Sequence, residues 1–196
     1  PTASSGGLLI LAAVAVISIV SKYIVRYRNV HLINPVALAA VLSGVFGLAY
    51  ASWWVGTAWF APLLILGGLL VVLKIRRLPM VLAGILASLL MVLIYAVIRD
   101  SISLSVFNGI LLTSPLWFFM TIMVTEPLST PAGERAQILY GIFIGLLSQI
   151  PFSVGPLFNS PELALVIANL LAWPLSLRGR LKMVGLKVNE GAKNTF

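Results

Sequence analysis

Seven long apolar runs, separated only by short polar connections, constrain the fold of this chain more than any other feature. A helix that crosses a bilayer needs about 20 mostly apolar residues, with a range of roughly 17–25. The runs that meet or nearly meet this requirement are Gly6–Val20, Pro35–Ala51, Ala58–Leu73, Pro79–Ile98, Val106–Val124, Ala136–Phe152 and Pro161–Leu177. The sequence therefore predicts an all-α, polytopic transmembrane helical bundle with about seven spans, in one domain covering residues 1–180.

The charges of the connections predict how this bundle is oriented. The chain is 60% hydrophobic and 9% charged and has a net charge of +8. Alternate connections carry most of the basic residues, which are Lys22, Arg26, Arg28, Lys74, Arg76, Arg77, Arg135, Arg178, Arg180 and Lys182, whereas the opposite connections carry only Arg99. Because basic loops face the cytoplasm, we expect the N-terminus outside and the C-terminus in the cytoplasm. The positive charge then indicates a lipid bilayer as the partner and no nucleic acid.

The residue inventory excludes several kinds of chemistry. The chain has no cysteine and one histidine, so it cannot build thiolate metal sites or disulfides, nor by itself a haem held by two histidines. The acidic residues near the runs all lie at their ends, at Asp100, Glu126, Glu134 and Glu162. Ion relays through a bilayer normally place ionisable groups inside it. We therefore expect no metal site, no catalytic residues of a hydrolase and no proton or sodium relay within the spans.

Two polar clusters at the predicted cytoplasmic ends of the helices hold the candidate binding residues. They are Arg26, Tyr27, Arg28, His31, Asn34 and Pro35 in the first cluster, and Thr125, Glu126, Pro127, Thr130 and Arg135 in the second. Arginine binds phosphate, tyrosine stacks on rings, and the start of a helix at Asn34 favours an anion. These residue types suit an aromatic ligand that bears a phosphate. Glu126, at the membrane boundary, could instead pair with a nearby basic residue.

Each cluster also has a structural explanation. Asn34 followed by Pro35 is typical of a helix start, with asparagine as the cap and proline in the first turn. Thr130 and Pro131, with Glu134 shortly after them, would begin the sixth helix in the same way. Helix capping and a binding site both remain open for these residues.

Two further patterns have structural explanations. Trp53, Trp54 and Trp59 lie at the expected outer end, where they form either an interfacial aromatic belt or an aromatic wall for a planar ligand. Gly141 and Gly145 form a GxxxG pair, which lets helix backbones approach closely.

The segments that hold the clusters resemble a known family. INPVALAA (Ile33–Ala40) and WFFMTIMVTEPLSTPAGERAQILYGIFIGLL (Trp117–Leu147) are similar to segments of NqrB and RnfD, and the closing NLLAWPL (Asn169–Leu175) also fits. These proteins are membrane subunits of the sodium-pumping NADH:quinone reductase and of the Rnf electron-transport complex. The resemblance covers roughly Lys22–Leu177. It implies a membrane redox domain in a bacterial or archaeal cytoplasmic membrane.

The resemblance also implies a flavin. Longer family members carry FMN on the threonine of an S-G-A-T motif, which does not occur in this sequence. The implied cofactor is therefore FMN or riboflavin bound without a covalent bond. By this resemblance the flavin ring would lie near Asn34 and Thr125 to Pro127, with Arg26 or Arg28 near a phosphate.

The tail after the last apolar run differs from the rest. Leu181–Phe196 is polar and alternating, and it is similar to the first strand of ferredoxin–NADP reductase-type domains, with Ala192, Thr195 and Phe196 at matching positions. We expect residues 181–196 to be the start of a truncated cytoplasmic domain. In that domain FAD would accept a hydride from NAD(P)H.

Three functions therefore remain open at the level of the sequence. The first is a redox domain that relays electrons from the fused reductase, through a flavin, to an unidentified acceptor. The second is a channel or transporter for a small solute, because the fold of this family is similar to that of urea and ammonium channels. The third is a structural anchor that holds the reductase at the membrane.

Overall fold

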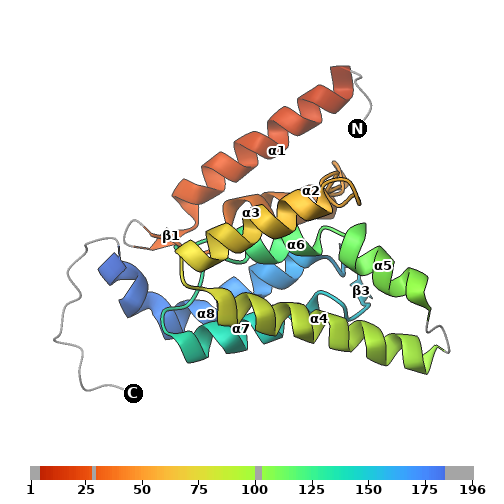
Figure 1. Cartoon of the computed structure of the whole chain (residues 1–196). Coiled ribbons are helices and arrows are strands. Elements are labelled where there is room, and N and C mark those ends of the chain that lie inside the picture. Colours follow the sequence, from red (N-terminus) through yellow and green to blue (C-terminus); the bar gives the residue numbers. More distant parts are fainter. Residues whose placement is uncertain (1–4, 28–29, 100–102, 184–196) are drawn as a thin grey trace.

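The structure is a computed structural model that describes residues 5–27, 30–99 and 103–183. It is mostly helical, and each of the seven apolar runs contains a helix, as predicted (Figure 1). The helices are α1 (Ser5–Ile24), α2 (Pro35–Val45), α3 (Ala61–Lys74), α4 (Leu78–Ile98), α5 (Leu104–Leu112), α6 (Leu116–Phe118), the π-helix η1 (Phe119–Met123), α7 (Glu134–Leu147) and α8 (Pro161–Met183). Two short antiparallel hairpins complete the fold, β1 (Arg26–Tyr27) with β2 (Val30–His31), and β3 (Ser153–Val154) with β4 (Leu157–Phe158).

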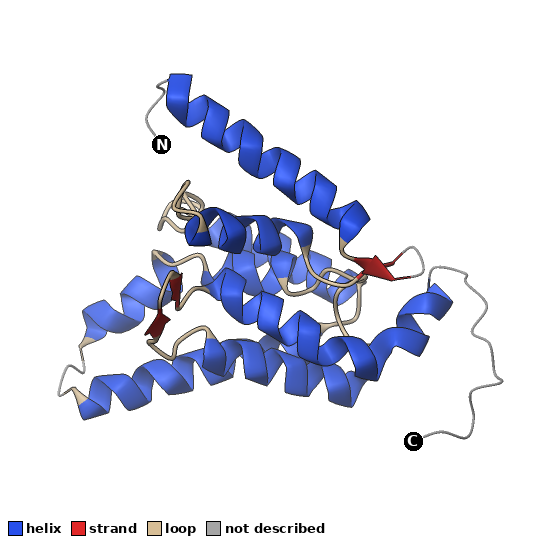
Figure 2. Ribbon diagram, turned by 180° about the vertical axis from the view of Figure 1, so that it is seen from behind, coloured by secondary structure: helices blue, strands red, loops and turns tan. Residues whose placement is uncertain are grey.

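The two hairpins lie at opposite ends of the helical bundle, as both views show (Figures 1 and 2). We call the end that carries β1, β2 and the start of α4 the basic end, and the end that carries β3 and β4 the opposite end. The C-terminal part of α8 and the start of α7 also lie at the basic end. Helix α1 packs on α2 and otherwise stands apart from the bundle.

Two of the described helices are long and apolar enough to cross a membrane by length and composition, Gly6–Ile24 of α1 and Leu78–Ile98. Large apolar side chains on α1, α3 and α4 are exposed, among them Leu9, Leu66 and Leu86. Soluble monomers rarely expose contiguous apolar surfaces of more than a few hundred Å². Such surfaces are those expected of helices that face lipid.

Helix α2 ends at Val45, earlier than the predicted Ala51, because Gly47 terminates it. Gly47 has a φ of 65°, a left-handed conformation that glycine adopts without steric cost. Its N–H donates to Gly44 O at 3.0 Å, and the next N–H, of Leu48, donates to Ser43 O at 2.9 Å. These two bonds satisfy the last carbonyls of the helix, a common way for helices to end.

The fifth apolar run is not the single helix that the sequence predicted. Pro115 has no N–H and cannot bond the carbonyl four residues before it. That carbonyl, of Leu111, instead accepts the indole N–H of Trp117 at 2.7 Å. After this break the chain forms η1, in which Val124 N–H donates to Phe119 O at 2.9 Å across five residues. Such π-helical turns occur frequently at functional sites.

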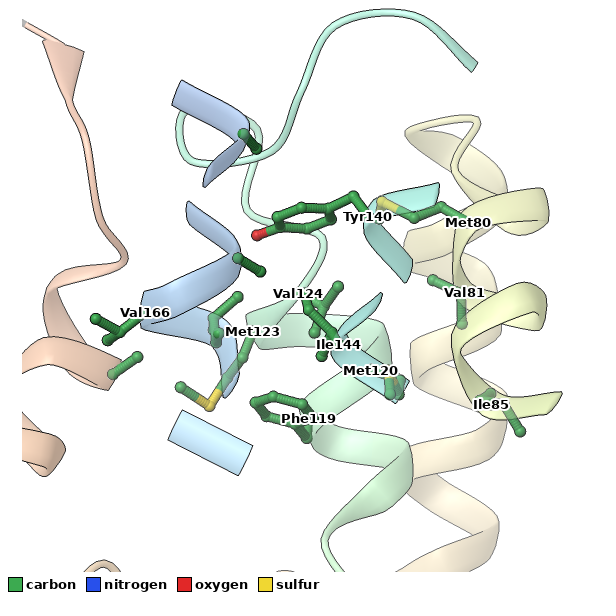
Figure 3. Close-up of a cluster of buried hydrophobic side chains, with 14 of the residues drawn as sticks. Met80, Val81, Ile85, Phe119, Met120, Met123, Val124, Tyr140, Ile144 and Val166 are labelled. Atoms are coloured by element: carbon green, nitrogen blue, oxygen red, sulfur yellow. The ribbon is translucent and has the colours of Figure 1, made fainter. Parts of the chain in front are cut away.

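The centre of the bundle is the crossing of α4 and α7. A Cβ at Gly141 or at Gly145 would overlap with carbonyl oxygens of α4, and one at Gly84 would come within 3.0 Å of Gly141 O. The predicted close approach at the GxxxG pair is therefore confirmed. Side chains of α4, η1, α7 and α8 form the core around this crossing (Figure 3), among them Met80, Met120, Ile144 and Leu165.

The predicted boundary between the two domains falls inside a helix. α8 continues through Leu181 to Met183, so these residues are helical in the structure. Residues 184–196, which hold the rest of the reductase-like tail, lie outside the described residues.

Candidate functional site

A hydrogen bond between side chains joins the two predicted clusters at the basic end. His31 Nε2 lies 2.7 Å from Glu126 Oε1, and His31 is 5% exposed. The second carboxylate oxygen of Glu126 accepts a hydrogen bond from the Ser129 hydroxyl at 2.9 Å. Both oxygens of this carboxylate are therefore held, one by the hairpin and one by the connection to α7. The predicted pairing of Glu126 with a basic residue is met by His31.

Asn34 makes the second link between these segments. Its Oδ1 accepts the N–H groups of Val36 and Ala37, each at 3.0 Å, which confirms Asn34 as the cap of α2 with Pro35 in the first turn. Its Nδ2 donates to the Met123 carbonyl at 3.4 Å. One side chain thus starts α2 and contacts the end of η1.

The other residues of the second cluster mainly shape the connection between η1 and α7. The Thr125 hydroxyl donates to Thr121 O at 2.7 Å, and the Thr130 hydroxyl donates to Glu126 O. Thr125 and Thr130 are buried, whereas Pro127 is exposed. These hydroxyls are engaged with backbone carbonyls, as is common for serine and threonine at helix ends.

The prediction that the sixth helix begins at Thr130 and Pro131 is wrong. α7 begins at Glu134, after Gly133 with a φ of 93°. Only glycine tolerates this conformation readily, so the chain turns at Gly133 before the helix can start. Pro131 lies in the connection, where its carbonyl accepts from Gln137 Nε2 at 3.1 Å.

Arg26 and Arg135, the described arginines of the two predicted clusters, take no part in this network. Arg26 and Arg135 are exposed, and neither forms an ion pair with another residue that the structure describes. Arg28 lies outside the described residues. Tyr27 is exposed, and its ring meets that of Trp173 edge-on, with the centroids 6.1 Å apart.

A second polar group at the basic end was not singled out from the sequence. Arg77, just before α4, is 6% exposed, and Asn169 on α8 is fully buried. The Tyr140 hydroxyl donates to Asn169 Oδ1 at 2.7 Å. Burial lowers the pKa of Arg77, and Tyr140 acts in the opposite direction. We call Arg77, Tyr140, Asn169 and Trp173 the donor cluster.

From the sequence, Arg77 was counted only as one of the basic residues in the connections. Asn169 was noted only as the first residue of the NLLAWPL segment that resembles the family. Two patterns could have singled them out. Arg77 directly precedes a long apolar helix, and Asn169 and Trp173 are four residues apart, so they share a face of α8.

The opposite end has a different polar centre. Glu162, at the start of α8, is 3% exposed and accepts the indole N–H of Trp53. Trp53 is half-buried and its ring lies 5.4 Å from that of Phe118, so it belongs to the interior and not to the predicted belt. Trp54 and Trp59 are exposed, as expected for belt residues. A small cavity of about 50 Å³ adjoins Glu162.

Comparison with known proteins identifies the family. No curated protein and no solved structure matches the chain. The profile of the NQR2, RnfD, RnfE family matches residues 46–176. This range holds Glu126 and the whole donor cluster, whereas His31 and Asn34 precede it. The match covers more than half of the sequence and confirms the resemblance, so the chain belongs to the NQR2, RnfD, RnfE family, whose members are membrane subunits of redox complexes.

Proposed function

We propose that this chain is the membrane part of an electron-transfer system and holds FMN or riboflavin, without a covalent bond, at the basic end. Electrons from NAD(P)H reach this flavin through a cytoplasmic domain that carries FAD, and they pass to an acceptor in or across the membrane. In this proposal the bundle crosses the membrane seven times with the basic end in the cytoplasm, as the distribution of basic residues favours.

The observation that carries the proposal is the joining of two distant segments at one end of the bundle. His31 and Glu126 are 95 residues apart in the sequence and hydrogen-bonded in the structure. Asn34 and Met123 make a second such link. These segments are the ones whose resemblance to the family implied a flavin. A flavin site built from both segments requires that they lie together, as they do here.

The described residues fit a flavin in two respects. Tyr27, beside Trp173, offers an exposed aromatic surface for a planar ring. Arg26 and Arg135 are exposed guanidinium groups at the same end, suited to a phosphate. The flavin would supply the electron-transfer chemistry, while the protein supplies position and electrostatics.

The structure also narrows the roles expected from the sequence. Asn34 and Thr125 already bond to backbone groups. In our proposal they therefore fix the shape of the site, and the exposed residues of the first cluster contact the ligand. His31 and Glu126 hold the two walls together.

An absorption spectrum of the chain, purified in a mild detergent, tests the proposal. We expect a flavin spectrum in the preparation or after incubation with FMN or riboflavin. Precipitation with acid should release the flavin into the supernatant, where its mass distinguishes FMN from riboflavin. A protein that takes up neither compound contradicts the proposal, and flavin that remains with the precipitate contradicts the non-covalent attachment.

A further inference from the structure

Three buried donors of the donor cluster have no hydrogen-bond partner among the residues that the structure describes. They are Arg77 Nη1, Asn169 Nδ2 and Trp173 Nε1. Each buried donor without a partner costs roughly 1–3 kcal/mol, and a charged one costs more. Natural proteins rarely leave such groups unsatisfied, so three in one neighbourhood indicate that a ligand's acceptor atoms belong there.

Tyr140 connects these donors in space. Its hydroxyl donates to Asn169 Oδ1 at 2.7 Å, and its neighbour Gly141 packs on Met80, three residues after Arg77 at the start of α4. Figure 3 shows the Tyr140 hydroxyl directed toward α8, away from Met80 on α4. Asn169 and Trp173 are one helical turn apart on α8. Asn169 Oδ1 is thus occupied, and the Nδ2 of the same side chain remains as a donor beside those of Arg77 and Trp173.

The charge of Arg77 is not balanced by the described part of the chain. The described part of the chain has three carboxylates. Glu126 is bonded to His31 and Ser129, and Glu134 is exposed. Glu162 is bonded to Trp53 at the opposite end. Water can satisfy a neutral donor, but a buried charge also needs a counter-charge.

The start of α4 adds to the positive potential. Arg77 occupies the cap position of this 21-residue helix, no side chain caps it, and its first turn has no acidic residue. The amino end of a helix carries a partial positive charge, although Pro79 in the first turn of α4 has no N–H to donate. Arg76, between α3 and α4, adds further positive charge at the same end.

We propose that the donor cluster is a binding site for a phosphate group, held by Arg77, Asn169 and Trp173 at the amino end of α4. Arginine matches a phosphate with parallel hydrogen bonds, and the two neutral donors bind the remaining oxygens. The phosphate belongs either to an anionic lipid headgroup at the membrane surface or to a soluble phosphate compound. The site does not depend on the proposed flavin.

Thermal unfolding of the purified chain in a neutral, phosphate-free detergent buffer tests this site. The probes are inorganic phosphate against chloride at equal ionic strength, and vesicles of phosphatidylglycerol against phosphatidylcholine. We expect a rise in Tm of about 5 °C at saturation with one of these probes. A response to inorganic phosphate assigns a soluble ligand, and a response to phosphatidylglycerol alone assigns a lipid headgroup. A larger rise with FMN than with riboflavin assigns the cofactor's phosphate to this site only where Arg77→Gln abolishes the difference, because the flavin proposal places that phosphate at Arg26 and Arg135.

Variants of the cluster show whether the response arises at this site. Arg77→Gln should abolish the rise in Tm. Asn169→Asp places a carboxylate inside the cluster and should abolish the rise while leaving the Tm of the ligand-free protein equal or higher. Trp173→Phe keeps the ring and loses one donor, so it should weaken the affinity about tenfold. Lys74→Gln removes a positive charge from the exposed last residue of α3, outside the donor cluster, and should leave the response intact.

Two results would overturn the proposal. One is a wild-type protein that none of the phosphate probes stabilises. The other is a response that persists in Arg77→Gln and Asn169→Asp as it does in Lys74→Gln, because this would show general attraction of anions to the basic end. If those two variants do not fold, Trp173→Phe decides the question, and an unchanged affinity for the probe contradicts the site.

Discussion

The two ends of the bundle each hold one carboxylate against a ring nitrogen, and the comparison shows how differently they are built. At the basic end, Glu126 pairs with His31 and joins the β1–β2 hairpin to the connection before α7. At the opposite end, the Glu162 carboxylate accepts the indole N–H of Trp53. The imidazole can carry a charge and the indole cannot. The surroundings differ too: one end has basic turns and donors without a partner among the described residues, and the other end has exposed tryptophans.

This difference separates two uses of a hydrogen-bonded carboxylate, the half-buried Glu126 and the buried Glu162. Glu162 satisfies a neutral donor, and its contact fastens the Trp53 segment to α8. Glu126 belongs to a network that links two segments distant in sequence, close to a cluster whose positive charge has no counter-charge among the described residues. The basic end therefore has the features of a binding site, and the opposite end has those of a structural contact beside a small cavity. The following substitutions test this distinction.

The largest loss of stability is expected at the α4–α7 crossing, because the helices of both ends pack there. Gly145→Leu places a side chain against the Gly84 carbonyl at the α4–α7 crossing, and overpacking there should cost about 3 kcal/mol or more. We expect little folded, monodisperse protein in detergent. The control is Gly67→Leu on α3, where a Cβ meets nothing within 4 Å. If both variants give equal yields, the crossing does not hold the two ends together.

The two carboxylates should contribute unequally to stability. Glu126→Leu leaves His31 buried without its partner and should lower the free energy of unfolding by about 2–3 kcal/mol. Glu162→Leu removes the acceptor of the half-buried Trp53 indole only, and should lower the free energy of unfolding by about 1–2 kcal/mol. Denaturant unfolding in detergent micelles measures both values.

A double variant checks that the loss in Glu126→Leu arises from the contact with His31. In His31→Leu/Glu126→Leu neither partner is left unsatisfied, so the combined cost should be smaller than the sum of the single costs. Purely additive costs would mean that the 2.7 Å contact contributes nothing.

The smallest effect concerns Asn34, which has two contacts that can be separated. Asn34→Ala removes the cap of α2 and should cost about 1 kcal/mol. Asn34→Asp keeps the cap but loses the donor to Met123 O, and should stay within about 0.5 kcal/mol of wild type because that contact is long at 3.4 Å. A larger loss in Asn34→Asp than in Asn34→Ala would show that the link to η1 matters more than the cap.

Most of the fold could be predicted because apolar runs and their connections report helices directly. Two failures were at breaks within the runs, and a third was the start of α7, which Gly133 delays to Glu134. Gly47 ends α2 early and Pro115 divides the fifth run, and in both cases a single residue overrides an apolar pattern that continues past it. The sequence showed both residues, but not which of several glycines and prolines would act in this way.

The candidate site could be predicted in part. The capping role of Asn34 follows from local chemistry, and the importance of Glu126 followed from its place at a membrane boundary. The pairing of Glu126 with His31 depends on how the hairpin folds back, which no local pattern encodes. Arg77 and Asn169 were missed because burial, and not residue type, distinguishes them from ordinary loop and helix residues.

The molar ratio of flavin to protein in the two carboxylate variants tests the central claim most directly. Each variant is purified under identical conditions with added FMN or riboflavin, unbound flavin is removed, and the flavin released by acid is measured against folded protein. If the basic end holds the flavin, Glu126→Leu should lose most of it, while Glu162→Leu keeps the wild-type ratio. Equal ratios in the two variants, or loss of flavin from Glu162→Leu alone, would contradict the account.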